Sequence, residues 1–341
     1  MLTRLIVSAE PGFPISSSGS IIRKDFILKP RKILLANFDG NAMIDRVYGG
    51  IETGGTNFVC AIGTTPDNLI KTQFATTSPD ESIGKAIDFF KSNSRQKQLT
   101  AIGIASFGPL DLDNSSPTYG YITTTPKRSW SNINIVQKIR SQLNVPVSID
   151  TDVNGAALGE QVWGASRGLD TFIYLTVGTG FGGGGMVNGE LIHGLLHPEM
   201  GHIRIPHDWQ KDPYTGCCPY HGDCLEGLAS GKAMELRWRQ SPEKLPSDHP
   251  AWELEASYLA LAINNFICTI SPQRIIIGGG LMKNPGLMPA VRRKVVDNLN
   301  GYIRSEAIMK DIDRYIVAPA LGDLAGVMGA LEFAKRLNQK I

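Results

Sequence analysis

Residues 47–62 read VYGGIETGGTNFVCAI, in which two apolar runs flank a polar turn that contains Gly54 and Gly55. Short apolar runs on either side of a glycine turn predict two strands joined as a hairpin. Residues 172–187 repeat this design as FIYLTV, the turn GTG and FGGGGMV, about 125 residues further along. Two such hairpins indicate two related lobes, each opening with a glycine-rich turn, with a cleft between them.

The segments around the two hairpins alternate between strand and helix patterns. Apolar residues at helical spacing predict helices at 83–92, 133–143, 256–268 and 324–337, and short apolar runs predict strands at 101–105, 145–149 and 274–277. This alternation is typical of an α/β architecture. Residues 1–45 mix prolines with a Ser-Gly run and have no sustained periodicity. We expect a loosely ordered extension there, with a short N-terminal subdomain as the alternative.

The composition argues against several classes of function. The 341 residues carry a net charge of +2 and only 19% of them are charged, so no overall basic field attracts nucleic acid or an anionic membrane. The least charged stretch, 171–189, contains seven glycines and is not a membrane span. The N-terminus has no signal-peptide pattern and the five cysteines are odd in number, so we expect a cytoplasmic protein without a disulfide framework.

Three glycine-rich turns, at 54–56, 178–180 and 278–280, follow strand patterns. Glycine lets backbone N–H groups approach phosphate oxygens that a Cβ would push away. The first turn is not a P-loop, because it lacks the Gly-Lys-Ser/Thr ending and leads into a strand. Each turn alone is weak evidence, and the first fits an ordinary hairpin equally well. The three together predict a cradle for phosphates and adenosine.

Two aspartates, Asp150 and Asp152, stand between the strand expected at 145–149 and a following helix pattern. Polar groups at the carboxyl end of a strand open into the ligand crevice of an α/β fold. One of the two fits the N-cap of the helix, which leaves the other unexplained. A carboxylate in the crevice can accept the proton of an attacking hydroxyl, which is the role of the base in phosphoryl transfer.

The stretch 193–224 holds five of the six histidines and three of the five cysteines. Cys218, His221 and Cys224 offer three ligands within seven residues, and His202 can be the fourth ligand of a tetrahedral zinc. Four protein ligands leave no open position, so this zinc would be structural. Free cysteines and surface histidines are the alternative. The spare candidates for the ligand set are Cys217 and His207.

Glu199 and Glu226 lie on or beside this stretch, and zinc on the loop would hold both carboxylates rigidly. Carboxylates together with an imidazole suit the hydroxyls of a sugar, which need both acceptors and donors. Ordinary surface acids are the alternative, and these residues by themselves do not decide between the two.

Over residues 46–338 these motifs resemble the ROK sugar kinases and, within that family, the bacterial fructokinases. The resemblance rests on GIETGGT at 50–56, Asp152 and Asn154 followed by AALGE, VGTG at 177–180, Glu199 with Gly201 and His202, and residues 218–226. It implies the actin-like ATPase fold, a ribonuclease H-like duplication in which two α/β lobes close on ATP and a sugar. The expected divisions are an N-terminal lobe at 46–158, a C-terminal lobe with the zinc loop at 159–322, and a last helix at 323–341 that packs back on the first lobe.

The resemblance also implies the reaction, transfer of the γ-phosphoryl group of Mg-ATP to the 6-hydroxyl of fructose, with Asp152 as general base. Mannose, glucose and N-acetylhexosamines are alternative acceptors. The expected cofactors are ATP, Mg²⁺ and structural Zn²⁺, and the expected assembly is a homodimer. The implied site residues are Asn154, Glu199, His202 and Glu226 at the sugar; Glu52, Gly54, Gly55, Thr56, Thr179 and Gly180 at the phosphates with magnesium; and Gly278, Gly279 and Gly280 at adenosine.

The chain departs from the family pattern at three positions. Most members have Asp where this chain has Glu52, many have Cys where it has His221, and Asn57 stands where we expect Lys. The first two departures resemble the fructokinase branch, and Glu52 keeps a carboxylate that can reach magnesium through water.

Two other functions are disfavoured. The family's repressors carry a winged-helix domain ahead of this fold, for which the roughly 45 residues before the first hairpin are too few. A sugar-binding module without catalysis would lack the base or the phosphate turns, and this chain has both.

Overall fold

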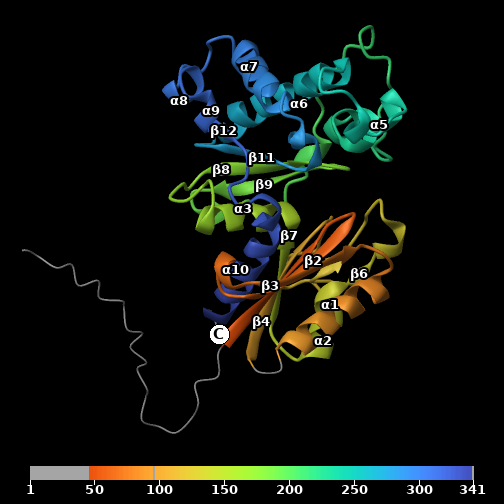
Figure 1. Ribbon diagram of the computed structural model, residues 1–341, viewed down its shortest axis with the longest axis vertical. Coiled ribbons are helices and arrows are strands. Elements are labelled where there is room, and N and C mark those ends of the chain that lie inside the picture. Colours follow the sequence, from red (N-terminus) through yellow and green to blue (C-terminus); the bar gives the residue numbers. More distant parts are fainter. Residues whose placement is uncertain (1–45, 95–96, 340–341) are drawn as a thin grey trace, which may run out of the picture. The chain divides into compact units, whose positions relative to one another are not determined.

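Two five-stranded sheets organise the part of the chain that the computed structural model describes, residues 46–94 and 97–339 (Figure 1). The expected extension at 1–45 lies outside these residues. The first sheet has the order β3-β2-β1-β4-β7; β2 is antiparallel to both β1 and β3, and β4 is parallel to both β1 and β7. Its strands are β1 (Arg46–Thr53), β2 (Asn57–Gly63), β3 (Ile70–Ala75), β4 (Gln98–Ser106) and β7 (Val147–Thr151).

The second sheet repeats the first in order and direction. Its order is β10-β9-β8-β11-β12; β9 is antiparallel to β8 and β10, and β11 is parallel to β8 and β12. The two predicted hairpins, β1/β2 and β8/β9, occupy equivalent central places, so the predicted duplication of an α/β lobe is confirmed. The strands are β8 (Phe172–Val177), β9 (Phe181–Val187), β10 (Glu190–Leu191), β11 (Ile275–Gly278) and β12 (Ile316–Val317).

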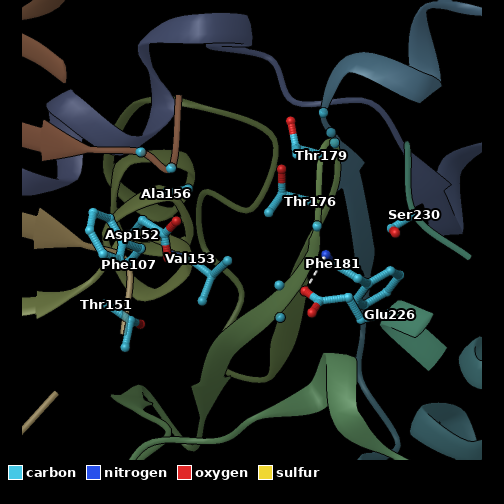
Figure 2. A pocket seen from close by; sticks show the side chains of 18 of the residues that line it. Phe107, Thr151, Asp152, Val153, Ala156, Thr176, Thr179, Phe181, Glu226 and Ser230 are labelled. Carbon is cyan, nitrogen blue, oxygen red and sulfur yellow. Dashed lines mark hydrogen bonds between the residues drawn. The ribbon is translucent and has the colours of Figure 1, made fainter. Parts of the chain in front are cut away.

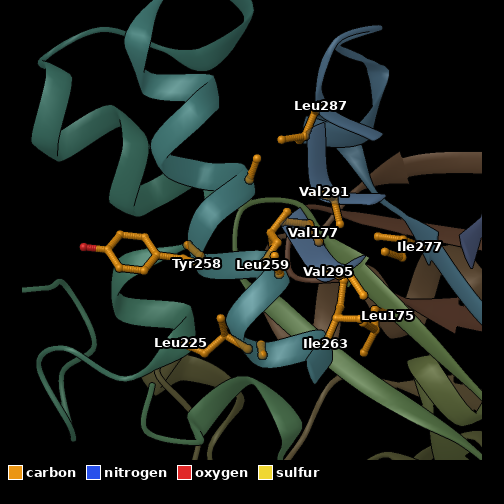
Figure 3. Close-up of a cluster of buried hydrophobic side chains, with 14 of the residues drawn as sticks. Leu175, Val177, Leu225, Tyr258, Leu259, Ile263, Ile277, Leu287, Val291 and Val295 are labelled. Carbon is orange, nitrogen blue, oxygen red and sulfur yellow. The ribbon is translucent and has the colours of Figure 1, made fainter. Parts of the chain in front are cut away.

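Alternate side chains of β8 point to opposite faces of the second sheet, and both faces are buried. Ile173, Leu175 and Val177 belong to a buried cluster with α6 (Pro250–Ile270) and α7 (Leu287–Leu299), part of which Figure 3 shows. Phe172 and Tyr174 point to the other face and pack with α3 (Asp152–Trp163). Because β8 is buried on both faces, its sequence reads as a nearly continuous apolar run.

The first sheet is covered by α1 (Pro79–Asn93) and α2 (Ile135–Leu143), and by α10 (Ala325–Gln339), which packs on β1 and β4. Helix α10 also packs against α3, so closely that a Cβ on Gly329 would lie 1.7 Å from the Gly155 backbone oxygen. Helix α3 contacts strands of both sheets. The division expected at 158–159 therefore falls inside a helix that both lobes share.

Several element boundaries differ from the sequence expectation; α1 and α6, for example, begin at Pro79 and Pro250 rather than at 83 and 256. The helix expected from 133 begins at Ile135, because β6 (Ile133–Asn134) pairs with β5 (Tyr121–Ile122) and the Asn134 side chain caps the helix. The strand expected at 145–149 continues to Thr151, which carries Asp150 to the end of the sheet.

The short helices are α4 (Leu225–Leu228), α5 (Gly231–Trp238), α8 (Glu306–Met309) and α9 (Ile312–Tyr315). In the described ranges, no helix combines the length and the apolar character that a membrane span needs.

Candidate active site

A cleft of about 1470 Å³ is lined by residues of both lobes, including the glycine turns after β1 and β8 and the start of α3 (Figure 2). Most of the residues predicted for the site lie on its wall, although they come from segments far apart in the chain. These are Glu52, Gly54, Gly55, Thr56, Asp152, Thr179, Gly180, Glu199, His202, His221, Glu226, Gly278 and Gly279. Asn154, Cys218, Cys224 and Gly280 are not part of the lining.

Asp152 is the first residue of α3 and lines the cleft (Figure 2). The N-cap of this helix is Thr151, whose hydroxyl accepts a hydrogen bond from the Asn154 backbone N–H at 3.1 Å. One oxygen of Asp152 accepts a hydrogen bond from the Val153 N–H at 2.9 Å. Burial raises the pKa of Asp152 from 3.8 to about 6. Asp152 is thus a cleft carboxylate that the helix does not need as a cap.

Asp150 has a different environment, behind the cleft wall. Its side chain is buried, with one oxygen accepting hydrogen bonds from the Thr151 N–H and the Asn154 amide and the other 2.9 Å from His193 Nε2. Asn154 is also fully buried, and its oxygen accepts a hydrogen bond from the Gly185 N–H at 3.1 Å. The geometry therefore gives Asn154 a role in holding β9 against α3, and does not support the predicted contact with sugar.

Glu52, near the end of β1, faces the start of α10. A Cβ on Gly326 would lie 2.4 Å from the Glu52 carboxyl carbon, so only glycine at that position leaves room for the carboxylate. Burial and the nearby charge of Asp152 raise the pKa of Glu52 to about 7. Its Oε2 atom is buried and has no hydrogen-bond partner among the residues that the structure describes. Such an orphaned carboxylate oxygen suits a divalent cation, which takes oxygen ligands.

The four predicted metal ligands converge on one point. The candidate ligand atoms of His202, Cys218, His221 and Cys224 all lie within 4.8 Å of one another. Nδ1 of His202 is 3.7 Å from Sγ of Cys218 and 3.5 Å from Sγ of Cys224. Zinc with bonds of about 2.3 Å to sulfur and 2.0–2.1 Å to nitrogen at the tetrahedral angle places such atoms about 3.6 Å apart. The residues therefore fit a tetrahedral metal.

The two spare candidates lie outside this group. The His207 ring contacts two other residues of the same loop: its Nε2 atom is 2.9 Å from the Asp212 carbonyl oxygen, and its Nδ1 atom is 3.5 Å from the Asp223 carboxylate. His207 therefore stabilises the loop without joining the group of ligands. Cys217 is half-buried and lines the cleft.

Two glutamates beside the metal group face the cleft. Glu226 follows Cys224 by two residues and accepts a hydrogen bond from the Phe181 N–H at 3.0 Å (Figure 2). Glu199 precedes His202 by three residues, and burial, followed by the charges of Asp152 and Glu226, raises its pKa to about 7. The two glutamates and Asp152 thus present acceptors to one space, as the hydroxyls of a sugar require.

Sequence reasoning missed several residues of the cleft wall. Lys127 and Lys283 bring positive charge to the lining, and Asp323 adds a further carboxylate beside Glu52. Isolated lysines and an aspartate ahead of a helix carry no pattern that marks them in the sequence. His197 also lines the cleft; it belongs to the histidine-rich stretch 193–224, but the sequence pattern indicates no specific role for it.

The sequence profile of the ROK family matches residues 48–337. The chain belongs to the ROK family. Among its relatives are a fructokinase from Zymomonas mobilis, 46% identical over 86% of this chain and 98% of that protein, and a fructokinase from Lactococcus lactis, 44% identical over 80% and 91%. The fold matches that of a ROK glucokinase from Streptomyces griseus solved with glucose and AMPPNP, with a TM-score of 0.68 and 22% identity over 85% of this chain and 99% of that one. The predicted family and its actin-like fold are confirmed.

Proposed function

We propose that this chain is an ATP-dependent fructokinase that phosphorylates the 6-hydroxyl of fructose. The observation that carries the proposal is the match to fructokinases at 38–46% identity over nearly their whole length. The cleft supplies the parts that such a reaction needs: glycine turns from both lobes, a carboxylate base and a group of sugar-facing acids.

Asp152 is the general base in this proposal. Its carboxylate takes the proton from the fructose 6-hydroxyl as that oxygen bonds to the γ-phosphorus, and the bond from the γ-phosphorus to the bridging oxygen breaks to release ADP. With a pKa of about 6, the carboxylate is mostly ionised at neutral pH and still basic enough to accept a proton. Catalysis is otherwise a matter of positioning and of charge stabilisation.

The nucleotide lies along the glycine turns. Gly54, Gly55 and Thr56 in the first lobe and Thr179 and Gly180 in the second hold the phosphates, and the turn that contains Gly278, Gly279 and Gly280 faces adenosine. Glu52, with its orphaned oxygen, would hold the magnesium ion. When bound, magnesium neutralises phosphate charge. Lys127 and Lys283 add positive charge to the lining of the same cleft.

The metal at His202, Cys218, His221 and Cys224 is a structural zinc in this proposal. Two thiolates and two imidazoles are ligands that zinc prefers, and four of them leave no open coordination position. Because Glu199 and Glu226 are close to the ligands in sequence, the zinc loop fixes both carboxylates at the sugar.

A coupled assay of ADP release tests the proposal with fructose, mannose, glucose and N-acetylhexosamines. We expect the highest kcat/KM for fructose, and no turnover of 6-deoxyfructose, which lacks the acceptor hydroxyl. A higher kcat/KM for another sugar would assign the enzyme to that sugar instead, and absence of ADP release with any of them would refute the kinase. The homodimer stays a prediction, which light scattering of the purified protein tests.

A further inference from the structure

The loop that follows β10 reaches across from the second lobe to the first at two histidines. His193 Nε2 is 2.9 Å from the carboxylate of Asp150, at the end of β7. His197 Nε2 accepts a hydrogen bond at 2.9 Å from the backbone N–H of Leu110, in the loop after β4. The same loop ends at Glu199, one of the acids at the sugar end of the cleft. A contact between lobes therefore lies two residues from a substrate-facing carboxylate.

The hydrogen bond from Leu110 fixes the tautomer of His197. Because a backbone N–H can only donate, Nε2 is the acceptor and the ring proton is on Nδ1. Nδ1 lies 3.3 Å from the Pro198 carbonyl oxygen and 3.6 Å from Oε1 of Glu199. The side chain is only 3% exposed, and burial lowers the pKa of His197, so the ring stays neutral and keeps its acceptor.

Glu199 is thereby placed between two imidazoles. Its Oε1 faces His197, and its Oε2 lies 3.9 Å from Nε2 of His202, a ligand in the metal group. The metal loop can hold one side of the carboxylate, but it belongs to the second lobe and does not respond to the position of the first. His197 does respond, because its Nε2 atom is hydrogen-bonded to the Leu110 N–H of the first lobe. Gly108 lets the ring approach so closely, since a Cβ there would lie 3.2 Å from His197 Cε1.

We propose that His197 is a positioning residue for sugar binding, which orients Glu199 from the second lobe and ties that orientation to the first lobe through Leu110. The proposal rests on the proposed fructokinase activity for its kinetic consequences. It makes the sugar subsite dependent on the approach of the two lobes: when Leu110 withdraws, the imidazole loses its anchor and Glu199 loses one of its two neighbours. The nucleotide subsite is built on the glycine turns of both lobes and does not use His197, whose partners are Leu110, Pro198 and Glu199.

The kinetic test compares His197→Ala with His197→Gln. Alanine leaves the Leu110 N–H without its acceptor and removes the neighbour of Glu199, so we expect the KM for fructose to rise by roughly 10- to 100-fold while the KM for ATP stays within about twofold. Glutamine offers an amide oxygen to Leu110 and an N–H toward the carboxylate, and should bring the KM for fructose back to within about fivefold of wild type. His249→Asn is the matched control, because His249 caps α6 away from the cleft and Asn is a good cap; it should change no constant.

Three kinetic results would overturn the proposal: a fructose KM within twofold of wild type in the alanine variant, an ATP KM that rises as far as the fructose KM, or a glutamine variant as impaired as alanine. The last two would reveal a merely structural histidine.

A second measurement needs neither a variant nor substrate. Nitrogen-15 chemical shifts of the imidazoles in the wild-type chain distinguish the two neutral tautomers. A proton on Nδ1 of His197 supports the proposal, and a proton on Nε2 refutes it. If the wild-type chain does not phosphorylate fructose, the proposed function fails, and the tautomer still decides whether His197 is anchored by Leu110.

Discussion

Replacing Asp152 by Asn should separate catalysis from stability. The amide oxygen of Asn can still accept the hydrogen bond from the Val153 N–H, and Thr151 still caps α3, so the local structure is kept. What Asn cannot do is accept the proton of the attacking hydroxyl. We expect kcat to fall by roughly 10²- to 10⁴-fold, or about 3–5 kcal/mol in the activation free energy, with fructose and ATP still bound.

The effect of the same change on stability has the opposite sign. Burial raises the pKa of Asp152 from 3.8 to about 6. A carboxyl group with a raised folded-state pKa costs stability as the pH rises from about 4 to 6 and remains unfavourable above that range. At 1.36 kcal/mol per pH unit the cost is at most about 3 kcal/mol, an upper limit because the cleft is open to solvent. Asn removes this cost, so the free energy of unfolding at pH 7.5 should stay the same or rise.

Asp150→Asn is the control, because it alters a neighbouring carboxylate that does not line the cleft. One oxygen of Asp150 accepts hydrogen bonds from the Thr151 N–H and the Asn154 amide, and the other lies 2.9 Å from His193 Nε2; an amide nitrogen in place of this second oxygen cannot accept a proton from the imidazole. We expect a loss of about 1–3 kcal/mol in stability with kcat reduced less than tenfold. Steady-state kinetics and urea unfolding measure both quantities. A near-native kcat in Asp152→Asn, or a larger loss of kcat in Asp150→Asn, would refute the assignment of the base.

Three further predictions concern the metal, the pH profile and the packing of the shared helices. Metal analysis of protein purified without added zinc should give about one zinc per chain. Cys224→Ala should lose the zinc along with several kcal/mol of stability, whereas Cys217→Ala should keep it. Equal metal content in the two variants would contradict the ligand set. With the pKa of Asp152 at about 6 and those of Glu52 and Glu199 at about 7, kcat/KM for fructose should fall by at least about tenfold per pH unit below pH 6 and level off only at about pH 8, since each group works as a carboxylate; a flat profile down to pH 5 would exclude Asp152 as the base. Gly329→Ala should cost more than about 3 kcal/mol of stability, because its Cβ meets the backbone of α3, whereas Gly84→Ala, in open space within α1, should add up to about 1 kcal/mol; urea midpoints decide.

Local patterns in the sequence are sufficient to predict much of the secondary structure and the fold of this protein. The two hairpins, the glycine turns and most of the helices longer than eight residues follow from apolar periodicity and from the residues that interrupt it, and these patterns act over a few neighbouring positions. The crowding of Cys218, His221 and Cys224 is likewise local, since one short loop brings three ligands together. Motifs of this kind were sufficient to predict the family, the duplicated fold and a metal site whose ligand atoms converge in the structure.

Only the tertiary structure shows the environment of residues whose neighbours come from distant segments of the chain. Asp150 and Asp152 are two residues apart and equivalent in pattern, yet one is held by His193 behind the wall and the other lines the cleft. Asn154 fits a sugar-binding motif in sequence, but folding buries it against β9. The His197–Leu110 bond joins positions 87 residues apart. Burial, pKa and hydrogen-bond partners depend on distance through space, and a linear pattern fixes such distances only within one element.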